Sequence, residues 1–113
     1  MSRASIRARR IETVGAELDA GTRLAAAARL DALGVAVLAE LEAQGVLERD
    51  IRLSQWLHLR LAGEGAAIAV VFADLPGMRA AFAKAHLARF GADPGATALV
   101  VQALECEARA DPR

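Results

Sequence analysis

Few side chains in this sequence are of the types that carry out acid, base or nucleophilic chemistry. The candidates are two histidines, His58 and His86, one cysteine, Cys106, and a carboxylate in a glycine-rich turn, Glu64. A zinc or iron site needs at least three convergent ligands, and no other Asp, Glu or Cys stands at metal-ligand spacing beside either histidine. We therefore expect no metal site.

The cysteine and the turn lack the surroundings that catalysis requires. Nothing in the sequence pairs Cys106 with the His and Asn that mark a nucleophile, so we expect a small buried hydrophobe. The turn around Glu64 lacks the lysine and serine of a phosphate-binding loop. An acid/base pair of His86 and Glu64 would need the two side chains within hydrogen-bond reach. We predict no catalytic, cofactor-binding or metal-binding residue.

Residues 51 to 61 alternate in polarity, which is the period of a half-buried strand. One face carries leucines, and the other carries Trp56, His58 and Arg60. Trp56 is either a second-layer core residue or an interface anchor. The turn holds two glycines, Gly63 and Gly65, which tolerate positive φ, and the apolar run after it predicts a hairpin.

Two segments show the period of a helix. Thr22 is a candidate N-cap for a helix that ends at Gly45 and carries an apolar stripe of Leu30, Leu33, Val37, Leu38 and Leu41. Gly34 in its middle suggests a close crossing against another backbone. The second helix carries Phe82, His86 and Phe90 at four-residue steps and stops at Gly91. There we expect His86 to bond a backbone carbonyl.

The order helix, strand, strand, helix, strand predicts an α+β fold. We expect two layers, with a small, mainly antiparallel sheet of about three strands and two main helices on one face. Residues 97–106 read as the last strand, and residues 107–113 as a polar tail. Residues 1–20 are expected to be a basic, partly ordered lead-in, with 2–10 frayed and 11–18 either helical or extended. Residues 21–113 would then form a single domain.

Composition narrows the class of partner. The 113 residues carry 14 basic and 14 acidic side chains, which gives no long-range field toward nucleic acid or an anionic membrane. No apolar run is long enough to span a membrane, and no signal peptide is visible. One cysteine fits a reducing compartment, so a cytoplasmic protein is expected. Hydrophobic residues make up 55% of the chain, many of them alanine, which suggests that neighbouring domains complete its core.

The segments RLSQWLHLRLAGEGAAIAV and AAFAKAHLARFG resemble the C-terminal part of the A-type subunit of the ATP-dependent hydantoinase/5-oxoprolinase family. In the hairpin the matching residues are Leu59, Arg60, Gly63, Ile68 and Val70. In the helix they are Phe82, His86, Phe90 and Gly91, with Phe90 where the family has Tyr. The sequence departs from the family pattern, which has Asp, Tyr, Gln and an acidic residue, at His58, Leu61, Glu64 and Ala67.

The resemblance implies a fragment-like domain of a hydrolase that couples ATP hydrolysis to the opening of a cyclic amide such as 5-oxoproline or a hydantoin. ATP would bind only in an ATPase domain outside these residues. The expected partners are that ATPase portion and a B-type subunit, and the isolated chain is expected to be inactive. The alternative is a self-contained oligomerisation or small-molecule-binding module, in which Trp56, His58 and Arg60 line a ligand site or a homodimer seam.

Overall fold

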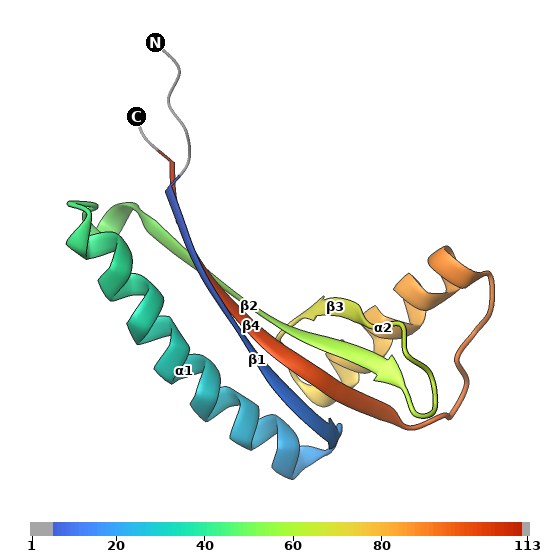
Figure 1. The fold of residues 1–113 in the computed structure, drawn as a ribbon. Helices are drawn as coiled ribbons and strands as arrows, with labels where there is room; N and C mark the ends of the chain where they lie inside the picture. Colours follow the sequence, from blue (N-terminus) through green and yellow to red (C-terminus); the bar gives the residue numbers. More distant parts are fainter. Residues whose placement is uncertain (1–5, 112–113) are drawn as a thin grey trace.

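The chain folds into one four-stranded antiparallel sheet with two helices, as a computed structural model that describes residues 6–111 shows (Figure 1). The elements are β1 (Ile6–Glu17), α1 (Ala20–Ala43), a short 3-10 helix (Glu48–Asp50), β2 (Ile51–Leu61), β3 (Ile68–Val71), α2 (Leu75–Phe90) and β4 (Leu99–Ala110). The strand order is β1-β4-β2-β3, so the first and last strands lie side by side. The predicted α+β class is confirmed.

Both helices pack on the same face of the sheet. The leucines Leu57, Leu59 and Leu61 of β2 are buried, as is Cys106 of β4, and a Cβ atom added to Gly34 of α1 would lie 3.9 Å from the Cys106 sulfur. On β3 the buried residues are Ile68 and Val70, which pair with Leu59 and Leu57. The core of the protein therefore lies between the leucine face of the sheet and the two helices.

The N-terminal segment is the main departure from the sequence-based expectation. Residues 6–17 form the fourth strand, β1, rather than a lead-in, and they pair with β4 along their length. In the sequence this segment looks like a solvated terminus, because it contains Arg7, Arg9 and Arg10. Ala8, however, is only 3% exposed, because it faces α1. Part of the segment predicted to be frayed, residues 2–5, lies outside the described residues.

Two element boundaries were also predicted wrongly. The N-cap of α1 is Asp19, whose carboxylate accepts a hydrogen bond from the backbone N–H of Thr22 at 2.7 Å. This bond lowers the pKa of Asp19. At the other end, β4 continues to Ala110 instead of giving way to a polar tail after Cys106, because Ala108 and Ala110 extend its buried alternation. The end of α2 at a left-handed Gly91 is as predicted.

Replacing Gly34 by alanine is expected to stabilise the protein. Gly34 lies in the interior of α1, where glycine costs about 1 kcal/mol relative to alanine. The added Cβ would meet only side-chain atoms, Leu53 Cδ1 at 3.8 Å and Cys106 Sγ at 3.9 Å, which are ordinary contacts. The close crossing of two backbones predicted from the sequence is therefore not found.

Urea unfolding checks this expectation, with a gain of about 1 kcal/mol in the free energy of unfolding. The control is Gly91→Ala, which should destabilise because Gly91 ends α2 at φ 71°. A loss of stability in Gly34→Ala would contradict the packing described for α1.

Candidate functional site

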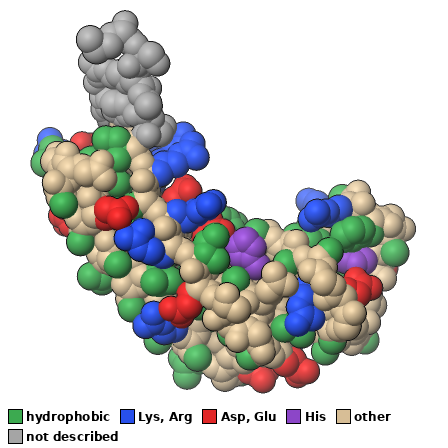
Figure 2. All heavy atoms as spheres, in the orientation of Figure 1, with side chains coloured by type: hydrophobic (Ala, Val, Ile, Leu, Met, Phe, Trp, Pro, Cys, Tyr) green, Lys and Arg blue, Asp and Glu red, His purple; other side chains and the backbone are tan. Residues whose placement is uncertain are grey.

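The face of the sheet opposite the helices is covered by no element among the described residues, and it is called here the open face. Its residues follow from the strand register and are Arg7, Arg9, Ile11, Thr13 and Glu17 on β1, Val100, Ala103, Glu105, Glu107 and Arg109 on β4, Arg52, Ser54, Trp56, His58 and Arg60 on β2, and Ala69 and Val71 on β3. In the view of Figure 1 the sheet is bowed, with α1 along its lower left side. Figure 2 shows the upper side of the same view hollowed, with charged and hydrophobic side chains interspersed.

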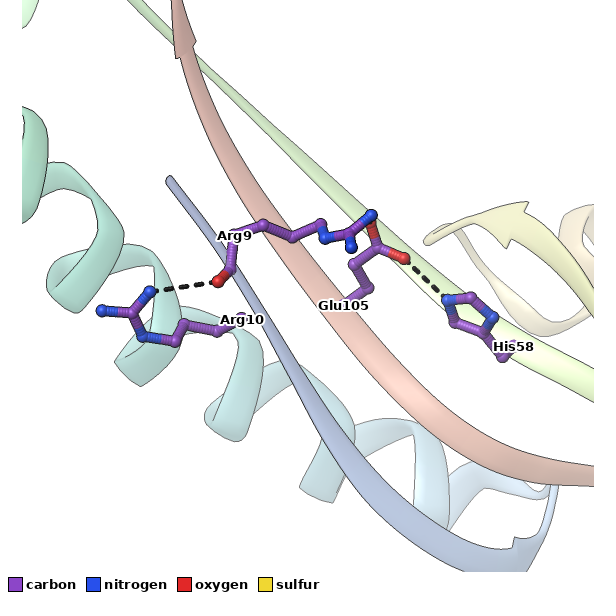
Figure 3. Close-up of polar contacts among 4 residues, drawn as sticks. All are labelled: Arg9, Arg10, His58 and Glu105. Carbon is purple, nitrogen blue, oxygen red and sulfur yellow. Dashed lines mark hydrogen bonds and ion pairs between the residues drawn. The ribbon is translucent and has the colours of Figure 1, made fainter. Parts of the chain in front are cut away.

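A buried carboxylate lies at the centre of the open face. Glu105 is 9% exposed, and its Oε1 atom lies 2.7 Å from Nε2 of His58. Its Oε2 atom lies 3.9 Å from a guanidinium nitrogen of Arg9, which reaches across from β1 (Figure 3). The short contact to His58 is a strong, charge-assisted type of hydrogen bond, whereas the longer contact to the exposed Arg9 contributes little. Three strands, β1, β4 and β2, thus contribute to one polar cluster.

Positive charge predominates on the open face. Five arginines lie on it, against the three glutamates Glu17, Glu105 and Glu107, so the face carries a formal charge of about +2 although the whole chain is neutral. Three of these arginines, Arg7, Arg109 and Arg52, stand directly opposite one another across β1, β4 and β2. Like charges in such a row repel, and of the three only Arg109 forms an ion pair with a carboxylate among the described residues, that of Asp111 at 3.3 Å. This end of the face is therefore electrostatically suited to a partner that carries carboxylates.

The other part of the open face is more apolar. Ile11 is 52% exposed and Val71 is 66% exposed, and Trp56 is half-buried between them in sheet order. Trp56 also lines a groove where β3 stops, together with Leu53, Ser54, Gln55, Val71 and Phe72. Exposed apolar side chains beside an aromatic ring are typical of contact surfaces.

The residues singled out in the sequence fall into two separate groups. Trp56, His58 and Arg60 share the open face, and Arg60 also bonds the backbone carbonyl of Glu64 in the hairpin turn at 3.2 Å. Gly63 in that turn has a φ of 85°. The remaining residues belong to α2 and its cap, which pack behind the sheet: Phe82, His86, Phe90 and Gly91.

His86 is held inside α2 and its C-terminal loop. Its Nδ1 atom lies 2.8 Å from the backbone carbonyl of Ala92, as the sequence predicts, and its ring lies between those of Phe82 and Phe90, tilted to both, with centroid distances of 5.6 and 4.9 Å. His86 as a residue is 7% exposed. The histidine that contacts a carboxylate is His58, and its partner is Glu105. The acid/base pair considered from the sequence was His86 with Glu64.

Sequence reasoning missed Glu105 and Arg9. A signal for Glu105 exists in the spacing of Glu105 and Glu107, which alternate with the apolar Leu104, Cys106 and Ala108 and so mark a second, polar face of the last strand. Arg9 carries no such signal, because its contact depends on the pairing of β1 with β4.

Cys106 is fully buried, and this burial raises the pKa of its thiol.

Across residues 6–111, no group of three or more His, Cys, Asp or Glu side chains could hold a metal ion. In the same range, no helix is long and apolar enough to cross a membrane.

The chain is similar in structure to parts of two ATP-dependent enzymes. Acetone carboxylase, in a nucleotide-free structure, matches 98% of this chain with a TM-score of 0.71 and 14% identity. ATP-dependent caprolactamase from Pseudomonas jessenii matches 94% of it with a TM-score of 0.53 and 25% identity. The likeness to acetone carboxylase shows a shared fold alone. A scan of protein-family models and a search of curated proteins find no match.

The matched region is a small share of both neighbours. This chain spans 18% of the acetone carboxylase chain and 17% of the caprolactamase chain. In both enzymes the matched region is therefore one part of a much longer polypeptide.

Proposed function

We propose that this chain is the non-catalytic C-terminal domain of a hydantoinase/5-oxoprolinase-like protein. One observation carries the proposal: nearly the whole chain superposes on less than a fifth of two enzymes that use ATP. The hairpin and helix residues that resemble the A-type subunit of this family support it independently. The parent protein would open a cyclic amide such as 5-oxoproline or a hydantoin at the expense of ATP.

The domain would contribute packing and subunit contacts through its open face. Trp56 and Val71 offer apolar area, and Arg52 and Arg60 offer charge to an acidic neighbour. The buried Glu105 holds His58 in place, so the centre of the face is ordered before a partner arrives. The partner would be the ATPase portion of the parent or a B-type subunit, and ATP would bind in the ATPase portion.

Docking on the open face can be tested through Trp56, the only tryptophan of the chain. The chain is labelled with 5-fluorotryptophan and titrated with the ATPase portion of a 5-oxoprolinase-type protein. We expect the single fluorine resonance to shift on binding, because Trp56 lies in the contact. We also expect no phosphate release when the chain alone is incubated with ATP and 5-oxoproline.

A matched pair of valines provides the control. Val71→Asp changes the open face, where Val71 is 66% exposed, and should weaken binding at least tenfold. Val35→Asp changes the solvent side of α1, where Val35 is 70% exposed, and should leave binding unchanged. Equal loss in both variants, or turnover by the isolated chain, would contradict the proposed role.

A further inference from the structure

The outer edge of β1 is a free sheet edge among the described residues. β1 is the end strand of the order β1-β4-β2-β3, and its twelve residues pair only with β4. Such an edge presents a row of N–H and C=O groups that can template pairing with another strand. The bulge opposite Gln102, with Gly15 at a φ of 77°, interrupts β1 only near its C-terminal end.

The register determines which backbone groups point outward. The N–H of Phe72 bonds the carbonyl of Gln55, so the odd-numbered residues of β2 bond toward β3 and the even-numbered ones toward β4. The pairs between β2 and β4, and then those between β4 and β1, carry this alternation across the sheet, so the even-numbered residues of β1 bond toward β4. The bond from the Leu18 N–H to the Leu99 carbonyl agrees with this assignment. The odd-numbered residues of β1, among them Arg9, Ile11 and Thr13, therefore face the free edge.

We propose that this edge binds the same edge of a second copy of the chain, antiparallel and with the two-fold axis at Ile11, so that two sheets join into one of eight strands. In that register Ile11 pairs with Ile11 of the second copy, and Arg9 pairs with Thr13. The outward-facing groups of these residues meet, and the three central pairs would exchange about six hydrogen bonds once the Thr13 N–H of the second copy replaces the Arg10 guanidinium, which bonds the Arg9 carbonyl at 3.0 Å in the single chain. This contact is made by the backbone edge of β1 and shares only the β1 residues with the open face, so it does not depend on the proposed parent enzyme.

Charge selects this register over its neighbours. With the axis at Ile11, Arg10 stands opposite Glu12 of the second copy twice, in pairs whose side chains approach most closely. Moving the axis by one residue would place Arg10 opposite Arg10, or Glu12 opposite Glu12, and like charges directly opposite are destabilising. In this register no pair of residues between Arg7 and Gly15 places two arginines opposite each other.

The helix partners of these residues extend the pairing into a network. Arg10 lies 2.8 Å from Glu40 of α1, and Glu12 forms a two-pronged contact with Arg29 of α1 at 2.6 and 2.9 Å. In the dimer, Glu40, Arg10, the second copy's Glu12 and the second copy's Arg29 would alternate in sign along one line. Alternating networks of this type contribute more than isolated surface pairs.

The space beside the edge accommodates a second copy. Arg29 and Glu40 of α1 contact β1. Ala25 and Ala36 stand one turn before them on the same side of the helix, and both are exposed. Their small side chains allow close approach of another helix. Between α1 and β1 lies a mainly apolar groove lined in part by Val14, Ala16, Ala25 and Leu104, which a neighbouring copy would cover.

Charge reversal in two separate variants tests the register. Arg10→Glu places Glu opposite Glu12 of its copy, and Glu12→Arg places Arg opposite Arg10, so each variant alone should have the mass of a single chain by light scattering. The 1:1 mixture brings opposite charges together in both pairs and should recover the dimer that the unmodified chain forms. Far-UV circular dichroism checks that both variants are folded.

A disulfide supplies a readout of geometry. In the Ile11→Cys variant the two new cysteines would stand directly opposite each other, with their Cα atoms about 5.5 Å apart. That distance is within reach of a disulfide bond, so the variant should cross-link on mild oxidation. Thr13→Cys is the matched control, because its two copies would lie four residues apart, about 14 Å along the strands, and should not cross-link. Native Cys106 is fully buried and should not interfere.

Three results would overturn the proposal. The first is an unmodified chain with the mass of a single copy at every concentration. The second is a dimer that survives both charge reversals. The third is a dimer lost on Trp56→Ala while Arg10→Glu leaves it intact, which would place the seam on the open face instead.

Discussion

Phe82→Ala is expected to lower the free energy of unfolding by about 3 to 5 kcal/mol, the range measured when a buried phenylalanine is truncated. Phe82 is 1% exposed and lies in α2 between Met78, which is fully buried, and His86. Its ring is the largest of the buried side chains with which α2 packs against the leucine face of the sheet. Removing it leaves a cavity that the short strand β3 has little room to close.

Phe90→Ala is the matched control for this prediction. Phe90 lies two turns further along the same helix and contacts the same histidine ring, at 4.9 Å, but it is 48% exposed. Its loss should cost about 1 kcal/mol, the scale of one aromatic contact. Chemical denaturation followed by circular dichroism measures both variants. Equal losses would mean that α2 is held by its C-terminal end instead of by Phe82.

Glu105→Ala is expected to lower the free energy of unfolding by about 1 to 3 kcal/mol, because His58 loses a hydrogen-bond partner in a part-buried position. The carboxylate contacts side chains from both neighbouring strands, His58 at 2.7 Å and Arg9 at 3.9 Å. Its removal should also loosen the His58 ring, which would appear as a change in the histidine resonances by NMR.

Two variants separate the hydrogen bond from the charge. Glu105→Gln retains an acceptor for His58 but removes the negative charge, so it loses the charge assistance of that bond as well as the weak attraction to the exposed Arg9, and it should cost about 1 kcal/mol, less than Glu105→Ala. Glu107→Ala removes the next glutamate on the same face of β4 and should change stability by no more than about 0.5 kcal/mol. A Gln variant as unstable as the Ala variant would show that the charge of Glu105 matters more than its bond to His58.

The local elements were predictable where one period dominates the sequence. In β2 the alternation from Ile51 to Leu61 gives the two faces that the structure has, because side chains of a strand point to opposite sides at every step. In α2 the four-residue spacing of Phe82, His86 and Phe90 and the glycine after them mark both the buried side and the end. The β1 segment shows no clear alternation of apolar and polar residues, because its buried Ala8 is small and arginines occupy the positions around it.

The centre of the open face could not be predicted, since it depends on strand order. Trp56 and His58 were placed on a polar face from the sequence, but Glu105 is 47 residues from His58 along the chain. The contact exists because β4 inserts between β1 and β2. The same insertion leaves β1 at the edge of the sheet, where its outward-facing backbone groups can pair with another chain.

By itself the sequence determined which side of α1, β2 and α2 is apolar, since that depends on short-range periodicity and on the intrinsic preferences of leucine, alanine and glycine. The tertiary structure alone decided which strands are neighbours, and therefore that Arg9, His58 and Glu105 meet and that β1 is an edge. The physical reason is that strand pairing is a long-range choice, made by the fit of whole faces against α1 and α2, and no local pattern of residues encodes it.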